Sequence, residues 1–494
     1  MEENRLIAER LRKLNDLREK GVNPYPHLFK PSKRSEDIKA AHKGLAAEEK
    51  SGVDESVAGR VMLLRNMGKA AFATLQDDKG KIQVYIRADD VGKEEYKLLK
   101  KVDLGDFIGV SGEVFKTRTG EVTIYAKSFE ILCKAIKPLP EKFHGVQDTE
   151  IKYRKRHLDL IMNADSKDVF LKRLHIMKAI REYMGELGFL EVETPALQTQ
   201  YGGAAAKPFM THHNELDIDM YLRVSPELYL KRLIVGGFEK VYDINKNFRN
   251  EGIDTTHNPE FTMLECYQAY ADYNDMMKLM EGMYEYVAKK VLGTTKVSFK
   301  GVEVDVKAPW PRIKMLDAIK EHSPIDASSA SVEELHQVIK DNKIEFTKEH
   351  NWGNMVGAIF EHFCEEKYTH PVFIIDHPKE STPLCKELRD GQDDRLIERF
   401  EPFAMGMELG NAYSELNDPL KQRELLVDQQ RQLDAGDGEA NPLDEEFLDA
   451  IETGMPPTGG LGIGVDRMIM LLTGQESIRD ILFFPTMKPV EDKK

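Results

Sequence analysis

The sequence predicts an α+β protein with a β-rich region near the N-terminus and a larger mixed region after it. Three observations support this fold class. The chain has 494 residues, which is more than a single domain usually contains. Residues 57–136 carry β-strand patterns in short successive runs, separated by turn-forming residues. Residues 241–267 read as a hairpin of two strands joined by a polar loop.

Composition excludes several classes of protein. The net charge of −15 argues against a protein that coats nucleic acid by bulk electrostatics, although a local basic patch remains possible. The four cysteines form no CxxC pair, so neither a zinc site nor a disulfide framework is indicated, and a reduced cytoplasmic setting fits best. No run approaches the ~18 apolar residues of a membrane span, so we expect no membrane partner.

The N-terminal segment, residues 1–55, is predicted to contain one helix and a connection. Residues 4–20 place Ile7, Leu11, Leu14 and Leu17 on one stripe, and Gly21 ends the helix. Its mixed charges predict a solvated face rather than a nucleic-acid arm, although the helix could lie along an RNA backbone. Residues 31–53 are polar and rich in lysine, which predicts a mobile or loosely helical connection.

Residues 56–140 are predicted to form an OB-fold. Three strands, a helical stretch at 91–101 and two more strands match this five-stranded barrel, whose face binds oligonucleotides. Arg65, Phe72 and Gln83 are candidates to stack on unpaired bases or hydrogen-bond to them. The alternative, that Phe72 belongs to the barrel core, has equal weight on this segment alone.

A linker at 141–160 is followed by a helix at 168–187 and the strand FLEVETPAL. Six apolar residues of the helix lie at helical spacing: Phe170, Leu174, Met177, Ile180, Met184 and Leu187. A further strand is predicted at 221–227, with Arg223, Ser225 and Glu227 on one face. Gly202 and Gly203 before it permit close approach of a ligand to the backbone.

The hairpin at 241–267 has the composition of an active-site wall. Asp243, Asn245, Asn247 and Arg249 alternate on one strand, and Phe261, Met263, Glu265 and Tyr267 alternate on the other. A ring, a carboxylate and a phenol opposite a guanidinium suit a ligand with an aromatic base, a phosphate and a cation. The alternative is an ordinary hairpin with a solvated polar face.

Two further segments complete the pattern. Residues 399–417 predict a kinked strand with a bulge near Gly410, and its half-buried setting means that its carboxylates need cations. Residues 459–474 predict a glycine-rich strand, flat enough for a nucleotide, followed by Asp466, Arg467 and an apolar helix. Between the hairpin and these segments the pattern is mostly helical, with a β patch at 296–306 and a buried strand at 371–378.

These segments together resemble the class II aminoacyl-tRNA synthetases of subclass IIb. FRNEG, a loop and HNPEFTMLE are similar to motif 2, the helix and strand with Pro195 to motif 1, and GxGxDR to motif 3. The resemblance implies a catalytic domain at 161–494, built on an antiparallel β-sheet flanked by helices, with a helical insertion at about 310–370. It also implies a homodimer through motif 1 and an OB-fold that reads the tRNA anticodon.

Within that subclass, GGAAAKPF, SPELYLKRL and MELGNAYSELND resemble the lysyl-tRNA synthetase family. An aspartate pocket would need cations, whereas this sequence offers glutamates. The resemblance implies L-lysine, ATP, Mg²⁺ and tRNA(Lys) as ligands. It implies a lysine–tRNA ligase that forms lysyl-adenylate and pyrophosphate and then transfers lysine to the 3′ end of the tRNA.

The resemblance also assigns residue roles. Arg249 and Arg467 are the catalytic residues. Lysine is held by Gly203, Glu227, Arg249, Glu265, Tyr267, Asn411 and Glu415. ATP is held by Arg249, Glu251, His257, Asn258, Phe261, Glu408 and Arg467, with Phe261 and Arg467 on the two faces of the adenine. Glu401 and Glu408 hold Mg²⁺, which prefers oxygen ligands and substrate phosphates.

One residue departs from the pattern, and two other functions compete with this one. Thr256 stands where many bacterial members carry arginine, which removes a phosphate contact from that position. A ligase that moves lysine onto a protein shares the catalytic domain but lacks the OB-fold. A non-catalytic RNA-binding relative would have lost the arginines or carboxylates of the motifs, all of which are present here.

Overall fold

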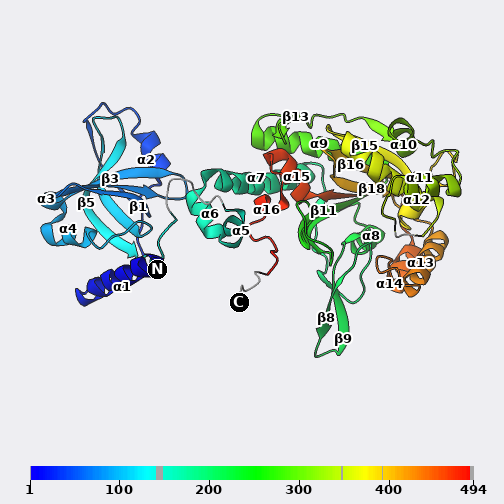
Figure 1. Ribbon diagram of the computed structural model, residues 1–494, viewed down its shortest axis with the longest axis horizontal. Helices are drawn as coiled ribbons and strands as arrows, with labels where there is room; N and C mark the ends of the chain where they lie inside the picture. The colour runs from blue at the N-terminus through cyan, green and yellow to red at the C-terminus, as the bar shows by residue number, and fades with distance from the viewer. Residues whose placement is uncertain (1, 141–147, 347–348, 392, 490–494) are drawn as a thin grey trace. The chain divides into compact units, whose positions relative to one another are not determined.

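The computed structural model describes residues 2–140, 148–346, 349–391 and 393–489 (Figure 1). The chain forms two compact units, Met1–Gly145 and Val146–Lys494. Residues 141–147, at the start of the predicted linker, lie outside the described residues. No described helix combines the length and the apolar character that crossing a bilayer requires.

A closed barrel with the strand order β1-β2-β3-β5-β4 forms the body of the first unit. Its elements are β1 (Lys50–Asn66), β2 (Ala70–Gln76), β3 (Lys81–Arg87), α3 (Ala88–Val91), α4 (Lys93–Leu99), β4 (Phe107–Lys116) and β5 (Val122–Cys133). Alternate residues of β2, namely Ala71, Ala73 and Leu75, are at most 1% exposed and fill the barrel. The predicted order of three strands, a helical stretch and two strands is confirmed.

The N-terminal helix α1 (Glu2–Glu19) confirms the predicted helix, and most of its charged residues are exposed as expected, with Arg10 as the exception. Arg10 is only 8% exposed. Its guanidinium donates hydrogen bonds to the backbone carbonyls of Leu104, Ala135 and Lys137. This side of the helix therefore packs on the barrel, where three backbone carbonyls satisfy the buried guanidinium.

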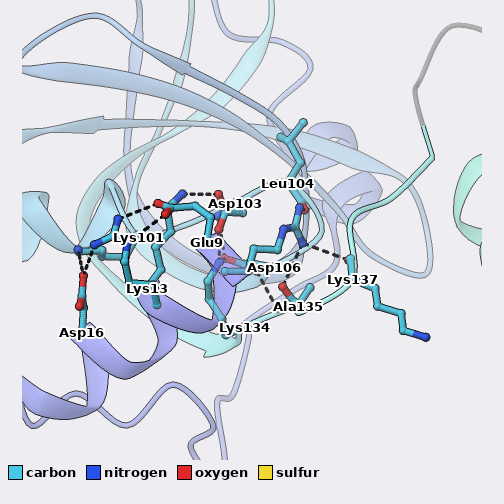
Figure 2. A network of polar contacts seen from close by, with 12 residues as sticks. Glu9, Lys13, Asp16, Lys101, Asp103, Leu104, Asp106, Lys134, Ala135 and Lys137 are labelled. Carbon is cyan, nitrogen blue, oxygen red and sulfur yellow. Dashed lines mark hydrogen bonds and ion pairs between the residues drawn. The ribbon is translucent and has the colours of Figure 1, made fainter. Parts of the chain in front are cut away.

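Charged side chains anchor the same helix (Figure 2). Lys13 Nζ lies 2.6 Å from Asp103, and the fully buried Lys134 lies between Asp103 and Asp106. Buried carboxylates are tolerated only when cations and hydrogen bonds compensate them, and Asp106 also accepts the N–H of Ala135 at 2.8 Å. The network fixes α1 to the barrel.

The segment before the barrel also differs from the prediction. Residues 31–53 contain α2 (Ser35–Ala41), whose Ile38 is fully buried, and the start of β1. The N–H and Oγ of Ser35 each donate to the carboxylate of Asp77 at 2.6 Å. The helical alternative is therefore confirmed and the mobile one is not, because buried Ile38 and the hydrogen bonds from Ser35 hold this short helix on the barrel.

A nine-stranded sheet carries the second unit, in the order β14-β15-β16-β18-β19-β11-β10-β6 with β17 paired to β16. The pairs from β15 to β10 are antiparallel, whereas β14 and β6 join its two edges in parallel. The strands are β6 (Leu190–Glu191), β10 (Lys240–Phe248), β11 (Glu260–Ala269), β14 (Arg312–Lys314), β15 (Val372–Pro378), β16 (Leu396–Ala404), β17 (Met407–Glu408), β18 (Gly410–Ser414) and β19 (Thr458–Gly464). The predicted hairpin is β10–β11, and the glycine-rich strand is β19.

Helices cover the two faces of this sheet differently (Figure 1). On one face, α7 (Ala164–Glu186), α9 (Tyr273–Leu292) and α15 (Val465–Thr473) enclose the largest apolar core, which includes Tyr242 and Cys266. On the other, α8 (Glu227–Val235) and α14 (Glu445–Thr453) pack near Val241 and Tyr267. The second face is covered only in part, which leaves room for a site.

The remaining elements surround this framework. The predicted insertion contains α10 (Met315–His322), α11 (Val332–Asp341), α12 (Trp352–Phe363) and η1 (Glu365–Lys367). The β patch at 296–306 is the hairpin of β12 (Lys296–Phe299) and β13 (Val302–Asp305). The others are α5 (Thr149–Arg154), α6 (Arg156–Met162), β7 (Leu197–Gln198), β8 (Phe209–His213), β9 (Ile218–Leu222), η2 (Lys379–Ser381), α13 (Pro419–Asp434) and α16 (Ile478–Ile481).

Helix α7 confirms the predicted long helix, but only part of its apolar stripe is buried. Phe170, Ile180 and Met184 are buried, whereas Leu174 is 52% exposed and Leu187 lies just beyond the last helical residue. The strand expected from FLEVETPAL is reduced to the two-residue strands β6 and β7. The segment between them contains Pro195, which lacks a backbone N–H and cannot continue a ladder.

Candidate active site

A cavity of about 350 Å³ opens on the partly covered face of the sheet. All the catalytic and ligand-binding residues predicted in the larger unit line it. They are Gly203, Glu227, Arg249, Glu251, His257, Asn258, Phe261, Glu265, Tyr267, Glu401, Glu408, Asn411, Glu415 and Arg467. These residues are up to 264 positions apart in the chain, from Gly203 to Arg467, so the fold alone brings them together.

Strand β19 supplies the floor of the cavity. Its Gly460 pairs with Tyr267 and Tyr413, and its Gly462 pairs with Glu265 and Asn411. A Cβ atom on Gly460 would lie 1.8 Å from the nearer carboxylate oxygen of Glu415. The glycines therefore leave space for the side chains of the strands on either side.

Three carboxylates meet at one end of the cavity, which we term the acidic end: Glu227, Glu265 and Glu415. Each is at most 4% exposed. Ser225 Oγ donates to Glu265, at 2.9 and 3.0 Å from its two oxygens. The hydroxyl of Tyr413 lies 2.6 and 2.7 Å from the two oxygens of Glu227. Burial, and then the Glu227 carboxylate, raise the pKa of Glu265 to about 8.

The wall formed by the predicted hairpin contains Arg249, which forms no ion pair within the described part of the chain. The guanidinium carbon of Arg249 lies 5.1 Å from the centre of the Phe261 ring, within cation–π range. Within the described residues, the buried Nε of Arg249 has no hydrogen-bond acceptor. A buried unsatisfied donor is costly, so this side chain is suited to receive an anion.

The loop between β10 and β11 presents a histidine to the second arginine. His257 Nδ1 lies 2.8 Å from Asp254, and its Nε2 lies 3.1 Å from Nη2 of Arg467. Although partial burial opposes the effect, hydrogen bonds from the N–H of Thr256 and from His257 lower the pKa of Asp254 to about 2. Thr256, the residue that departs from the family pattern, thus shapes this loop through Asp254.

Two carboxylates on the β16–β17 hairpin form a candidate cation site. Glu408 pairs with Phe403, so Glu401 lies diagonally across on the same face. Enclosure in the cavity, and then the Glu401 carboxylate, raise the pKa of Glu408. Nη2 of Arg399 donates to Glu401 at 2.5 Å. Within the described residues no three acidic, histidine or cysteine side chains are grouped to hold a metal. Two carboxylates suit Mg²⁺, which takes its other ligands from water and phosphates.

Aromatic side chains gather on the outer face of the barrel in the first unit. Phe72 stacks on Tyr85 at 4.4 Å, and Phe115 and Tyr125 complete the group. Arg65 pairs with Phe72 across the strands, and Gln83 accepts a hydrogen bond from Thr123. Phe72 is half-buried and lies outside the barrel core, to which β2 contributes Ala71, Ala73 and Leu75.

Comparison with known proteins agrees with this architecture. Residues 148–488 match the family described as tRNA synthetases class II (D, K and N). Residues 55–132 match the family described as the OB-fold nucleic acid binding domain. The chain belongs to the class II tRNA synthetases.

Similarity extends over the whole synthetase. This chain is 52% identical to the lysine–tRNA ligase of Clostridium novyi, with 99% of this chain and 95% of that protein aligned. It is 51% identical to the lysine–tRNA ligase of Pelotomaculum thermopropionicum, with 99% of this chain and 96% of that protein aligned. The predicted family and fold, an OB-fold followed by a class II catalytic domain, are confirmed.

Two predicted strands of the synthetase are wrong in detail. The strand expected at 221–227 ends at Leu222, and Glu227 begins α8. The reason is Pro226, whose fixed φ and missing N–H suit a helix start. Glu227 therefore reaches the cavity from a helix, with its backbone N–H 3.1 Å from Ser225 Oγ.

The kinked strand expected at 399–417 is a hairpin. Met405 and Gly406 both have positive φ, 54° and 68°, and reverse the chain between β16 and β17. Such values match a two-residue hairpin turn. The break expected near Gly410 is present, between β17 and β18. Glu401 therefore lies on a different strand from Glu408, and the turn brings the two together.

Sequence reasoning left out three residues of the cavity. Tyr413 shares the alternation of Asn411 and Glu415 along β18, and this period of two could have revealed it. Ser225 was placed near Glu227 but received no role. Arg399 donates to both Asn411 and Glu401, and only the strand pairing shows this link.

The raised pKa of Glu265 predicts how stability depends on pH. Its folded pKa of about 8 exceeds the usual 4.5, so the folded state binds the extra proton and loses stability as pH rises between these values. Each unit of pKa difference corresponds to about 1.4 kcal/mol. The Glu265→Gln variant has no carboxylate at this position, so it should not lose stability in this way as pH rises. Calorimetry without substrates should show its Tm gaining on wild type from about pH 5 to about pH 8.

The exposed Glu260 at the start of the same strand provides the control. Glu260→Gln makes the same chemical change outside the buried part of the cavity, and its Tm measured over the same pH range gives the baseline. A Tm difference for Glu265→Gln that does not change with pH would show that Glu265 is ionised in the folded protein.

Proposed function

We propose that this synthetase is a lysine–tRNA ligase. It activates L-lysine with ATP to lysyl-adenylate and pyrophosphate, and then transfers lysine to the 3′ end of tRNA(Lys). The observation that carries the proposal is the acidic end of the cavity, where Glu227, Glu265 and Glu415 share one desolvated space. A substrate with two ammonium groups and one carboxylate matches three carboxylates at one end and Arg249 beyond them. The names of the aligned relatives support the same assignment.

Lysine fits the cavity in one orientation. Glu227, with the backbone of Gly203, holds the α-ammonium, because a Cβ at Gly203 would lie only 2.9 Å from that of Glu227. Glu415, Glu265 and Tyr267 receive the ε-ammonium, with Asn411 on β18, which β19 separates from β11. Arg249 holds the α-carboxylate and the α-phosphate of ATP, where its free Nε donates. This orientation leaves the carboxylate facing the nucleotide.

The nucleotide lies beyond Arg249. Phe261 and Arg467 enclose the adenine, and His257 lies beside the phosphates. Glu251 also lines the cavity. Asn258 supports the nucleotide site by holding the loop in place. Its amide N–H donates to the carbonyl of Glu260, and its amide oxygen accepts a hydrogen bond from the N–H of Thr486. Mg²⁺, held by Glu401 and Glu408, would neutralise phosphate charge when it is bound.

The reaction needs no protein nucleophile. Catalysis depends on positioning the two substrates and on stabilising the charge of the transition state. The lysine carboxylate attacks the α-phosphorus in line, the bond to the bridging oxygen breaks, and pyrophosphate leaves. Arg249 stabilises the charge that develops on the α-phosphate, and Arg467 stabilises the nucleotide end. A ribose hydroxyl of the tRNA then attacks the carbonyl of the adenylate, and AMP leaves.

The rival functions make different demands. A ligase acting on a protein would not need the barrel, which is closed and carries an aromatic group on its face. A non-catalytic relative would not need an arginine with a buried free donor beside three carboxylates. We also propose a reducing cytoplasmic setting, which the four free thiols support. Aminoacylation of purified tRNA with each amino acid in turn separates these functions, and lysine alone should be charged efficiently.

Glu415→Gln tests the substrate. The variant keeps the shape of the side chain and removes its charge, so kcat/KM for lysine in pyrophosphate exchange should fall by the equivalent of ~2–5 kcal/mol. The KM for ATP should change little. Glu408→Gln is the contrasting variant and should weaken Mg²⁺ dependence and ATP use. Intact lysine kinetics in Glu415→Gln, or better activation of aspartate or asparagine by wild type, would refute the assignment.

Phe72→Ala tests the proposed anticodon contact by Arg65, Phe72 and Gln83. Loss of one stacked base should weaken tRNA charging by roughly 1–3 kcal/mol, while adenylate formation without tRNA stays near wild type. Phe107, a half-buried ring that lies beside Arg60 instead of in the aromatic group, provides a control in Phe107→Ala. An equal fall in charging and pyrophosphate exchange would make Phe72 a folding residue.

We also propose that the synthetase is a homodimer through segment 168–195. Leu171, Leu174 and Leu190 expose 43%, 52% and 52% of their surfaces along this segment, a common feature of interfaces. Wild type should sediment as a dimer, and Leu174→Arg should shift it to the monomer. Leu420→Arg on α13, where the leucine is 78% exposed, should leave the mass unchanged. A fully active wild-type monomer would contradict the proposal.

A further inference from the structure

The acidic end of the cavity contains a lysine that belongs to the protein itself. Lys231 follows Glu227 by one turn of α8, and its side chain has no exposed surface. Its Nζ lies 2.6 Å from Glu227 and also pairs with Glu415. Lys231 does not line the cavity. It lies behind the two carboxylates that face the opposite ends of the proposed substrate.

The surroundings of Lys231 hold its ammonium in place. Nζ lies 5.6 Å from the centre of the Tyr413 ring and 5.9 Å from that of Phe447. Tyr413 in turn contacts both oxygens of Glu227. Glu415 has little freedom, because its carboxylate lies directly over Gly460. A buried ammonium enclosed by rings and two carboxylates cannot turn toward solvent.

Counting charges shows what this ammonium does for a bound substrate. Glu227, Glu265 and Glu415 bring three negative charges, and Lys231 and Arg249 bring two positive ones. The nearby Arg223 and Asp243 pair with each other at 3.1 Å and cancel. A bound lysine adds one net positive charge, so the complex is neutral with all three glutamates ionised. Without Lys231, one glutamate would have to take up a proton, because an uncompensated buried charge is expensive.

We infer that Lys231 is a positioning and specificity-determining residue, whose ammonium aims Glu227 and Glu415 and lets two carboxylates, rather than one, receive the ε-ammonium of the substrate. This inference rests on the proposed function. It explains why a pocket for a cation contains a cation of its own. Burial alone would lower the pKa of Lys231, but Glu227 and Glu415 raise it, so the side chain stays charged.

The test compares lysine with norleucine, which has the same carbon chain but no ε-ammonium. In Lys231→Met, the KM for lysine in pyrophosphate exchange should rise roughly 30-fold or more, the scale for losing one partner of a buried charge pair. The KM for ATP should stay within about threefold. The inhibition constant of norleucine should rise much less than the KM for lysine, because norleucine uses Glu227 but not the carboxylates at the ε position. Lys231→Gln keeps a polar donor without the charge and should show the same changes as Lys231→Met. It replaces Lys231→Met in the test if that variant does not fold.

Lys134 offers a matched control in the other unit. It is also a fully buried lysine between two carboxylates, Asp103 and Asp106, but it anchors helix α1 to the barrel (Figure 2). Lys134→Met should destabilise that unit and leave the lysine KM in pyrophosphate exchange unchanged. The control separates the general loss of a buried lysine from the loss of this one.

The outcomes separate this inference from the proposed function. If wild type does not exchange pyrophosphate with lysine, the proposed function fails. If wild type is active and the Lys231 variants keep its lysine KM, only the inference fails. If lysine KM, norleucine inhibition and ATP KM all worsen equally, Lys231 supports the fold of the site in general and the specificity role is overturned.

Discussion

Three carboxylates share one desolvated space, and much of the catalytic unit is arranged around that constraint. Burying one ionised carboxylate without partners costs several kcal/mol, and like charges close together add to the cost. Each of these carboxylates has an internal partner: Ser225 and Tyr413 donate hydrogen bonds to Glu265 and Glu227, and Lys231 forms an ion pair with Glu415. The partners come from different elements, so the sheet and helix α8 must assemble before the pocket exists.

The glycine floor follows from the same constraint. The side chains of β11 and β18 turn inward over β19, and Gly460 and Gly462 provide the only kind of residue that leaves them room. A Cβ at Gly462 would lie 2.6 Å from the Met263 side chain, as one at Gly460 would collide with Glu415. The floor therefore serves packing as well as the flat surface that a nucleotide needs.

The opposite end of the cavity differs, because arginines accompany the carboxylates there. Arg249 and Arg467 line this end, where the proposed reaction would develop negative charge, and the carboxylates of Glu401 and Glu408 form the candidate cation site. Arg399 links the two regions, because it donates to Asn411 toward the acidic end and to Glu401 toward the nucleotide end. A cavity with carboxylates at one end and arginines at the other orients a substrate that is itself charged at both ends.

The sequence by itself predicted most of the elements, the family motifs and the residues that line the cavity, because periods of two and 3.6 and short ordered motifs are local properties of the chain. The barrel strands, the β10–β11 hairpin and the glycine-rich strand were all predictable for this reason. Tertiary structure alone decided the turn at Met405 and Gly406, the helical start at Glu227 and the burial of Arg10 against the barrel. It also decided the pairing of Lys231 with both Glu227 and Glu415: the first partner is four residues away, but the second is 184 residues away. Residues that far apart can form an ion pair only after the sheet has formed. No local pattern in the sequence shows which buried cation will pair with which carboxylate.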